Sequence, residues 1–180
     1  MKINKTFIED LLIIQPKLFK DKRGFFYESY NKKLLNKILN INFIQDNESK
    51  SKKGVVRGLH FQKPPYDQTK LIRCVSGKVL DVVVDLRTNS KTYGKSFSIE
   101  LSSENNKQLL VPVGFAHGFQ VLSESAIVNY KVDNHYNKKF DSGIIWNDKD
   151  LSIDWNYDLK PILSKKDLEL ISFKEFKSPF

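Results

Sequence analysis

The chain has 180 residues, 40% of them hydrophobic and 12% aromatic, which is typical of a folded globular protein and predicts one domain over residues 1–180. The single cysteine, Cys74, excludes an intramolecular disulfide framework, and no apolar run reaches the length of a membrane span. The formal charge of +9 comes from lysines dispersed along the chain, which indicates a solvated surface that suits a small anionic substrate and argues against nucleic-acid binding. The apolar run at residues 11–14 is too short for a signal peptide, so we expect a soluble cytoplasmic protein.

The N-terminal part predicts two strands and a helix. Strands are expected at residues 11–14 and 25–30, with a turn at residues 21–24 before the second. Asn31 can cap an amphipathic helix, in which apolar side chains recur at helical spacing at Leu34, Leu35, Ile38 and Leu39.

Short β-branched or alternating runs then follow one another without intervening helices, at residues 43–44, 55–56, 71–75, 79–86, 97–101, 108–111 and 126–132. Ser76 and Gly77 predict a hairpin turn between two of these strands. In the run 79–86 one face is apolar, and the other carries Asp81 and Asp85. We interpret this mixed face as solvent-exposed, with a polar interior as the alternative. The pattern favours a double-sheet sandwich or barrel over a parallel α/β sheet.

The C-terminal part predicts aromatic packing followed by a helix. Trp146 and Trp155 are expected to pack on the barrel, and a helical stretch is expected to begin at Ser164 and to reach about Phe173. Glycine-rich phosphate-binding loops are absent from the sequence, which argues against a dinucleotide-binding fold.

Two histidine motifs are the main chemical signal. Residues 57–62 read RGLHFQ and residues 112–119 read PVGFAHGF. Metal-binding barrels usually carry His-x-His in the first motif, but here Gln62 replaces the second histidine. His60 and His117 alone are too few for a divalent metal site, so the motifs indicate proton transfer by an imidazole.

With these motifs in place, the chain closely resembles the dTDP-4-dehydrorhamnose 3,5-epimerase family. The resemblance rests on segments in the family's order and spacing, at residues 21–28, 45–49, 54–62, 68–71, 84–87, 112–119, 146–148 and 163–167. It implies a mainly β fold, a cupin-type jelly-roll β-barrel with a few short peripheral helices. It also implies a homodimer that works without metal or cofactor on a nucleoside-diphosphate 4-keto-6-deoxy sugar.

The resemblance also assigns catalytic roles. A 4-keto group acidifies the hydrogens on C3 and C5, so the reaction needs a base, a group that stabilises the enolate, and an acid on the opposite face. His60 matches the base, Asp167 the carboxylate that orients it, Lys70 the enolate-stabilising cation, and Tyr130 the proton donor. His117 matches a further contact to sugar or phosphate.

The remaining matched positions bind the substrate. Two arginines correspond to phosphate contacts, and the others surround the nucleotide or sugar; together they are Arg23, Arg57, Glu28, Gln45, Asn47, Tyr136, Asp141 and Lys166. Asp141 stands where a longer Glu is common. His135 and Asn137 beside Tyr136 also depart from the family pattern.

Each assignment has a structural alternative. His60 is alternatively a core histidine, and Asp167 a capping-box residue with Ser164 that bonds only backbone. Tyr130 is alternatively a packing aromatic, and Lys70 an exposed lysine.

Three other functions compete with the 3,5-epimerase. The first is a sibling enzyme that acts on a GDP-linked 4-keto-6-deoxy-heptose or inverts C3 only. The second is a non-catalytic sugar-nucleotide-binding barrel, and the third is a metal cupin.

Overall fold

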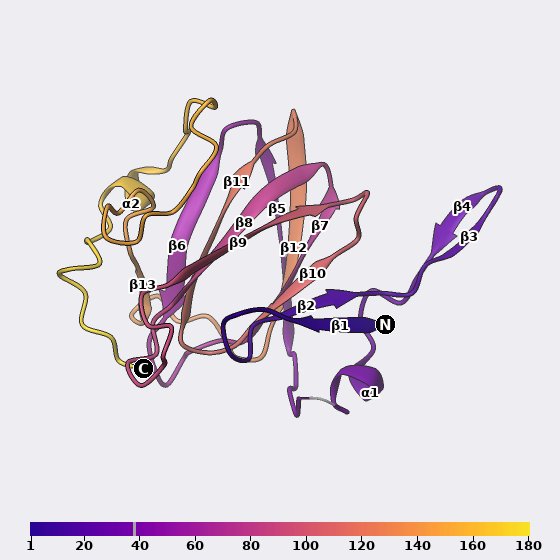
Figure 1. Cartoon of the computed structure of the whole chain (residues 1–180), viewed down its shortest axis with the longest axis horizontal. Helices are drawn as coiled ribbons and strands as arrows, with labels where there is room; N and C mark the ends of the chain where they lie inside the picture. The colour runs from indigo at the N-terminus through magenta and orange to yellow at the C-terminus, as the bar shows by residue number, and fades with distance from the viewer. Residues whose placement is uncertain (38) are drawn as a thin grey trace.

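Within residues 1–37 and 39–180, the computed structural model contains two facing antiparallel sheets, a small two-stranded arm and two one-turn helices (Figure 1). The first sheet has the strand order β1-β2-β10-β7-β12-β5, formed by β1 (Lys2–Lys5), β2 (Leu12–Gln15), β5 (Gln45–Lys52), β7 (Lys70–Ser76), β10 (Gln108–Val111) and β12 (Ser125–Val132). The second has the order β13-β6-β11-β8-β9, formed by β6 (Val56–Gln62), β8 (Lys78–Asp85), β9 (Ser96–Ser102), β11 (Phe115–Val121) and β13 (Asp141–Gly143). This is the jelly-roll architecture that the sequence predicts.

The main hydrophobic core lies between the two sheets. Ile72 and Val128 from the first sheet pack with Val83, Leu101 and Phe119 from the second, and all five are buried. A second core lies on the outer face of the five-stranded sheet, where the C-terminal segment covers it with the buried rings of Trp146 and Trp155. The prediction that both tryptophans pack on the barrel is therefore confirmed.

Strand β8 corrects two predictions. Ser76 and Gly77 do not form a hairpin, because β7 and β8 belong to different sheets and the chain crosses between them at Gly77, whose φ is +76°. The mixed face of β8 does not meet solvent either, since Asp81 and Asp85 are both 0% exposed. The side chain of Asp81 reaches into the interior, and the C-terminal segment covers the other face.

Other elements differ in extent from the prediction. The sequence patterns do not predict the polar strand β5, nor β11 and β13, while residues 43–44 lie outside any strand. Asn31 caps α1 as predicted and accepts from the Leu34 backbone N–H, but α1 (Lys32–Leu35) ends at Leu35, before Asn36, a C-cap residue with low helix propensity. The predicted helical position Ile38 lies outside the described residues. Ser164 likewise caps α2 (Lys165–Leu168), which ends well before Phe173.

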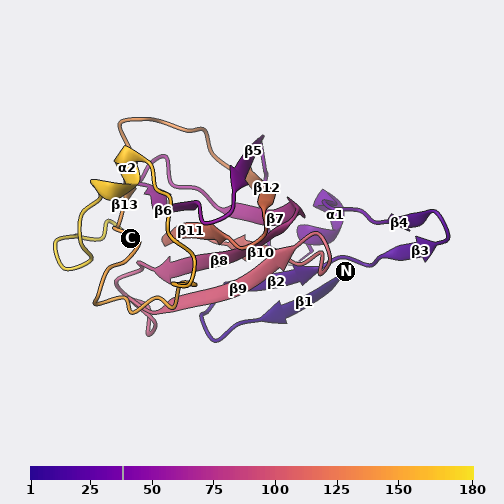
Figure 2. The same ribbon diagram turned by 90° about the horizontal axis from the view of Figure 1, so that it is seen from above.

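The arm is formed by β3 (Phe19–Asp21) and β4 (Gly24–Phe26), and it extends from the barrel at the end opposite the C-terminal segment (Figures 1 and 2). Its aromatic side chains Phe19, Phe25 and Phe26 are each more than half exposed. No helix in the described part of the chain has the length and hydropathy of a membrane-spanning segment.

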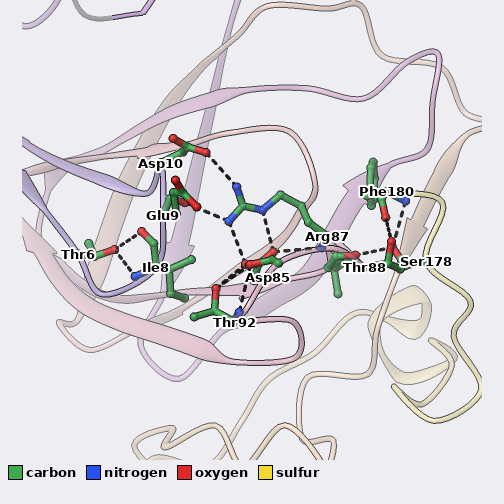
Figure 3. Close-up of polar contacts among 12 residues, drawn as sticks. Thr6, Ile8, Glu9, Asp10, Asp85, Arg87, Thr88, Thr92, Ser178 and Phe180 are labelled. Carbon is green, nitrogen blue, oxygen red and sulfur yellow. Dashed lines mark hydrogen bonds and ion pairs between the residues drawn. The ribbon is translucent and has the colours of Figure 1, made fainter.

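Hydrogen bonds from Arg87 connect the N-terminal loop to the end of β8 (Figure 3). Its guanidinium donates two hydrogen bonds to the buried carboxylate of Asp85 and others to Asp10 and to the Glu9 carbonyl. The same guanidinium lies 4.7 Å from the Phe115 ring centroid, within cation–π range. The segment at residues 84–87, part of the resemblance, thus has a structural role in this chain.

Candidate active site

A histidine–aspartate pair lies at the edge of the barrel interior. His60 Nε2, on β6, is 2.5 Å from Asp167 Oδ1, on α2, and Asp167 is only 3% exposed. Ser164 caps α2 by accepting from the Asp167 backbone N–H, and its hydroxyl donates to Asp167 Oδ2 at 2.6 Å. The capping interaction and the histidine contact therefore coexist, because they use different atoms of Asp167.

The electrostatics of Asp167 favour a carboxylate. Burial raises the pKa of this carboxyl group, but the hydrogen bonds from His60 and Ser164 outweigh burial and lower it to about 2. An ionised Asp167 holds the imidazole in place and stabilises the imidazolium that forms when His60 takes up a proton. The pair therefore has the geometry of an oriented general base.

Two further candidate groups come from the opposite sheet. Tyr130, on β12, packs against the interior core and lines the same cavities as His60. Burial raises the pKa of the Tyr130 phenol, which keeps it protonated at neutral pH. The packing alternative for Tyr130 is thus compatible with a chemical role.

Lys70, the first residue of β7, is 8% exposed, so the exposed-lysine alternative is wrong. Its Nζ donates to the His60 carbonyl at 3.4 Å. Burial lowers the pKa of Lys70 to about 8, and the carboxylates of Asp81 and Asp141 limit this decrease. The lysine therefore remains largely an ammonium at pH 7, beside the candidate base, where an enolate charge would develop.

These groups border two adjoining pockets. The first, of about 360 Å³, we call the Tyr136 pocket; it is lined by Gln45, Asn47, His60, Gln62, Gln68, Lys70, Tyr130, Tyr136, Asp141 and Lys166. The second, of about 320 Å³, we call the His117 pocket; it is lined by Ser49, Arg57, His60, Lys70, His117, Gly118, Phe119, Tyr130, Ser164, Lys166 and Asp167. His60, Lys70, Tyr130 and Lys166 line both, so the two pockets share the candidate chemistry.

The predicted binding residues are fixed by local contacts. Arg57 Nε donates to Ser51 Oγ at 3.1 Å, and Gln45 Nε2 donates to Asn47 Oδ1 at 2.8 Å. In the His117 pocket, His117 Nε2 lies 2.9 Å from Asp81 Oδ2, and both side chains are buried. His117 is therefore paired with the buried carboxylate of Asp81, as His60 is paired with Asp167.

Tyr136, Asp141 and Lys166 form one chain of contacts. The Tyr136 hydroxyl donates to Asp141 Oδ2 at 2.9 Å, and the same oxygen accepts from Lys166 Nζ at 2.5 Å. Asp141 is shorter than the Glu that is common at this position in the family, but its carboxylate still contacts both Tyr136 and Lys166. Lys166 precedes Asp167 in α2, so one helical turn contacts both ends of the site.

Two predicted residues do not line either pocket. Arg23 lies on the arm with a side chain that is 89% exposed, and its guanidinium bonds Asp21. Glu28 lines a separate hollow of about 180 Å³ beside α1. Within a single chain, neither Arg23 nor Glu28 lines a pocket that His60 lines.

Three residues make contacts that the sequence reasoning misses. From the sequence, Asp81 is expected to be solvent-exposed, Gln62 to be only a replacement for a metal ligand, and Ser164 to be only a helix cap. The signal for Asp81 is its position between Leu80 and Val82 in a mostly apolar strand, where a charged residue that is buried requires a partner. For Gln62, no signal in the sequence indicates which backbone groups its amide bonds.

The fold and the site together define a class of protein, a jelly-roll barrel with acid–base groups in its interior. An imidazole–carboxylate pair, a buried ammonium and a phenol border the same pockets. Acid–base chemistry on a bound substrate requires such groups close together. Comparison with known proteins then identifies the family. The chain belongs to the dTDP-4-dehydrorhamnose 3,5-epimerase family, whose model matches residues 5–175.

Individual relatives agree with this assignment. A dTDP-4-dehydrorhamnose 3,5-epimerase from Shigella flexneri is 51% identical over 170 residues, 93% of either chain. The crystal structure of one from Elizabethkingia anophelis NUHP1 is 52% identical, with a TM-score of 0.92 over 97% of each chain. A dTDP-6-deoxy-D-glucose-3,5-epimerase from Legionella pneumophila Philadelphia 1, solved in complex with dTDP-4-keto-L-rhamnose, is 42% identical, with a TM-score of 0.94 over 98% of this chain and 94% of that one.

Proposed function

We propose that the chain is a dTDP-4-dehydrorhamnose 3,5-epimerase, which converts dTDP-4-dehydro-6-deoxy-D-glucose to dTDP-4-dehydro-L-rhamnose. The observation that carries this proposal is the placement of His60 and Tyr130 on opposing sheets around the same two pockets. Inversion at a carbon needs a base on one face and an acid on the other, and this arrangement supplies both. The names of the relatives support the dTDP-linked hexose as substrate.

The proposed reaction proceeds through an enolate at each carbon. His60 takes the proton from C3, and the electron pair of the C–H bond moves onto the C4 oxygen. The Lys70 ammonium stabilises that oxyanion, while Asp167 stabilises the imidazolium. Tyr130 then donates its phenolic proton to the opposite face of C3, and the ketone re-forms. After His60 has lost its proton and Tyr130 has regained one through solvent, the same sequence inverts C5.

The remaining residues are proposed to hold the nucleotide. Arg57 and Lys166 place positive charge at the pockets, which suits the diphosphate, and Tyr136 presents a ring to the nucleotide base. Gln45 and Asn47 contribute amide groups to the Tyr136 pocket, and His117 a ring nitrogen to the other. No cofactor takes part in these steps.

The proposal includes a homodimer in which the arm of one subunit completes the pocket of the other. The arm projects from the barrel (Figure 2). On this arm the guanidinium of Arg23 bonds its neighbour Asp21, and Phe25 and Phe26 are each more than half exposed. Exposed aromatic side chains of this kind are typical of an interaction surface. A partner's arm would supply Arg23, the second of the two predicted phosphate-binding arginines, beside the Arg57 that already lines the pocket.

The GDP-heptose enzyme is not favoured by the relatives, whose names specify dTDP-linked hexoses. The departures at His135 and Asn137 offer no argument for it either, because neither residue lines the Tyr136 pocket or the His117 pocket. The non-catalytic barrel conflicts with the intact set of His60, Asp167, Lys70 and Tyr130.

Solvent exchange tests the proposal directly. In D2O with dTDP-4-keto-6-deoxy-glucose, NMR should show deuterium entering at both C3 and C5, and a GDP-linked 4-keto-heptose in a parallel sample should show none. His60→Asn should abolish exchange and still bind dTDP. Exchange at C3 alone, or only with the GDP sugar, would assign the sibling activity.

A further inference from the structure

Gln62 occupies the position at which metal-binding barrels carry a second histidine, but its amide is fully engaged by backbone. Its Nε2 donates to the carbonyls of Tyr66 at 2.9 Å and of His135 at 3.2 Å. Its Oε1 accepts from the Asn137 backbone N–H at 2.7 Å. The side chain is 5% exposed. These partners demand two donors and one acceptor, which only a carboxamide in this orientation supplies.

Two of the three bonds flank Tyr136. The peptide groups on either side of this residue are held by one buried side chain, and the Tyr136 hydroxyl is held by Asp141. Asp141 in β13 is the register partner of Gln62 in β6, so the two holding residues lie side by side on paired strands. Tyr136 is nonetheless 56% exposed, and its ring is open to the Tyr136 pocket.

We propose that Gln62 is a positioning residue for nucleotide binding, which acts by fixing the backbone of Tyr136 before the substrate arrives. The inference rests on the proposed function, in which Tyr136 contacts the nucleotide base. An exposed loop aromatic loses conformational freedom when a ligand packs on it, and a loop already fixed by buried hydrogen bonds loses less. Gln62 therefore contributes to affinity without contacting the reacting carbons.

Titration of the protein with dTDP, the probe, tests this. Gln62→Met keeps the length of the side chain and removes all three hydrogen bonds. It should raise the Kd for dTDP by up to about tenfold, corresponding to the ordering of one side chain and its loop. The exchange rate at C3 with saturating nucleotide sugar should stay within about threefold, since general-base catalysis by His60 is retained.

Gln120→Met is the matched control. Gln120 is also buried, and its amide also bonds backbone, the N–H and carbonyl of Asn156, on the covered side of β11 away from both pockets. This variant should lose stability and bind dTDP as the unmodified protein does. Comparable dTDP affinity in the two variants would overturn the proposal.

A double-mutant cycle separates positioning of Tyr136 from general loosening. In a Tyr136→Ala background, Gln62→Met should change the Kd by less than about twofold, because the residue through which it acts is gone. An undiminished effect there would refute the route through Tyr136. If Gln62→Met does not fold, Gln62→Glu is the substitute. It keeps the bond to the Asn137 N–H and replaces the NH2 group that donates to both carbonyls with an oxygen that only accepts, so the Kd for dTDP should rise at neutral pH. Failure of the unmodified protein to bind dTDP would instead contradict the proposed function.

Discussion

The imidazole of His60 and the carboxylate of Asp167 are in contact, with Nε2 and Oδ1 2.5 Å apart, although one residue lies on β6 and the other on a one-turn helix near the end of the chain. Ser164 occupies the second oxygen of the same carboxylate. The imidazole and the helix cap therefore hold the two oxygens of this carboxylate from different sides.

Asp167→Asn should lower kcat by about 10²–10⁴-fold, the usual range for general-base catalysis, because the amide cannot stabilise an imidazolium as a carboxylate does. Asp148→Asn is its control: that buried carboxylate accepts from backbone N–H groups of Asp150, Leu151 and Phe173, and its loss should affect stability but not turnover. Equal turnover losses in the two variants would contradict the assigned role.

Asp167 should also make stability depend on pH. The pKa of its carboxyl group is about 2 in the folded chain and 3.8 for an unperturbed aspartate, so the unfolded state binds the proton more tightly. The contribution of Asp167 is therefore fully present above about pH 4 and decreases as the pH falls towards about 2. Denaturant unfolding of the unmodified protein and of Asp167→Asn, measured from about pH 5 down to about pH 2, should show a steeper loss of stability in the unmodified protein. Parallel losses in the two proteins would assign the pH dependence to other carboxylates.

Lys70→Met should make the protein more stable and less active. Burial disfavours the ammonium, as the lowered pKa of Lys70 indicates, so its removal should raise the free energy of unfolding at pH 7 by about 1–4 kcal/mol. Loss of the oxyanion's partner should lower kcat by about 10²–10³-fold. In the unmodified protein, activity that needs the ammonium should fall as the pH rises through about 8, the pKa of Lys70. A variant that is active and keeps this alkaline decrease would show that another group is responsible.

Tyr130→Phe should uncouple exchange from inversion. His60 can still remove a proton and return a deuteron to the same face, so NMR in D2O should detect deuterium at C3 in unchanged substrate. The inverted product should form about 10²–10⁴-fold more slowly, because the acid on the opposite face is missing. Inversion at an unchanged rate would assign that proton to a different donor.

Complementation tests the proposed exchange of arms. Arg23→Ala and His60→Asn variants should each be inactive or weakly active, whereas their co-expressed mixture should regain up to about one quarter of full activity, as expected for random twofold dimers. In hybrid dimers the intact arm of one subunit meets the intact base of the other. Absence of recovery in dimers shown to be mixed by mass measurement would rule out arm exchange, and an active monomer in sedimentation would rule out the dimer itself.

Metal removal should leave activity unchanged. His60 and His117 are each in contact with a carboxylate, Asp167 and Asp81 respectively, and both contacts serve the chemistry proposed for the pockets. Dialysis against a chelator followed by elemental analysis and the exchange assay checks this. Stoichiometric iron, manganese or zinc with activity that depends on it would overturn the proposed mechanism.

Much of the fold can be predicted from local patterns. The apolar run at β10 (Gln108–Val111) matches its predicted bounds, and Asn31 and Ser164 cap the helices they are expected to cap. These signals are local because strand alternation and capping depend on neighbours within a few residues. The residues of the candidate site are named through a family resemblance, not through spacing.

Long-range packing decided the rest. The turn at Gly77 joins two sheets instead of two paired strands, and Asp81 is interior because β8 is covered on both faces. Neither fact is encoded near those residues, since burial of a strand face depends on which distant segment covers it, here the one that carries Trp146. The sequence by itself determined strand periodicity, helix caps and the inventory of chemical groups. Only the tertiary structure decided that His60 meets Asp167 and that Gln62 holds the loop of Tyr136, because both depend on strand pairing and packing between segments far apart in the chain.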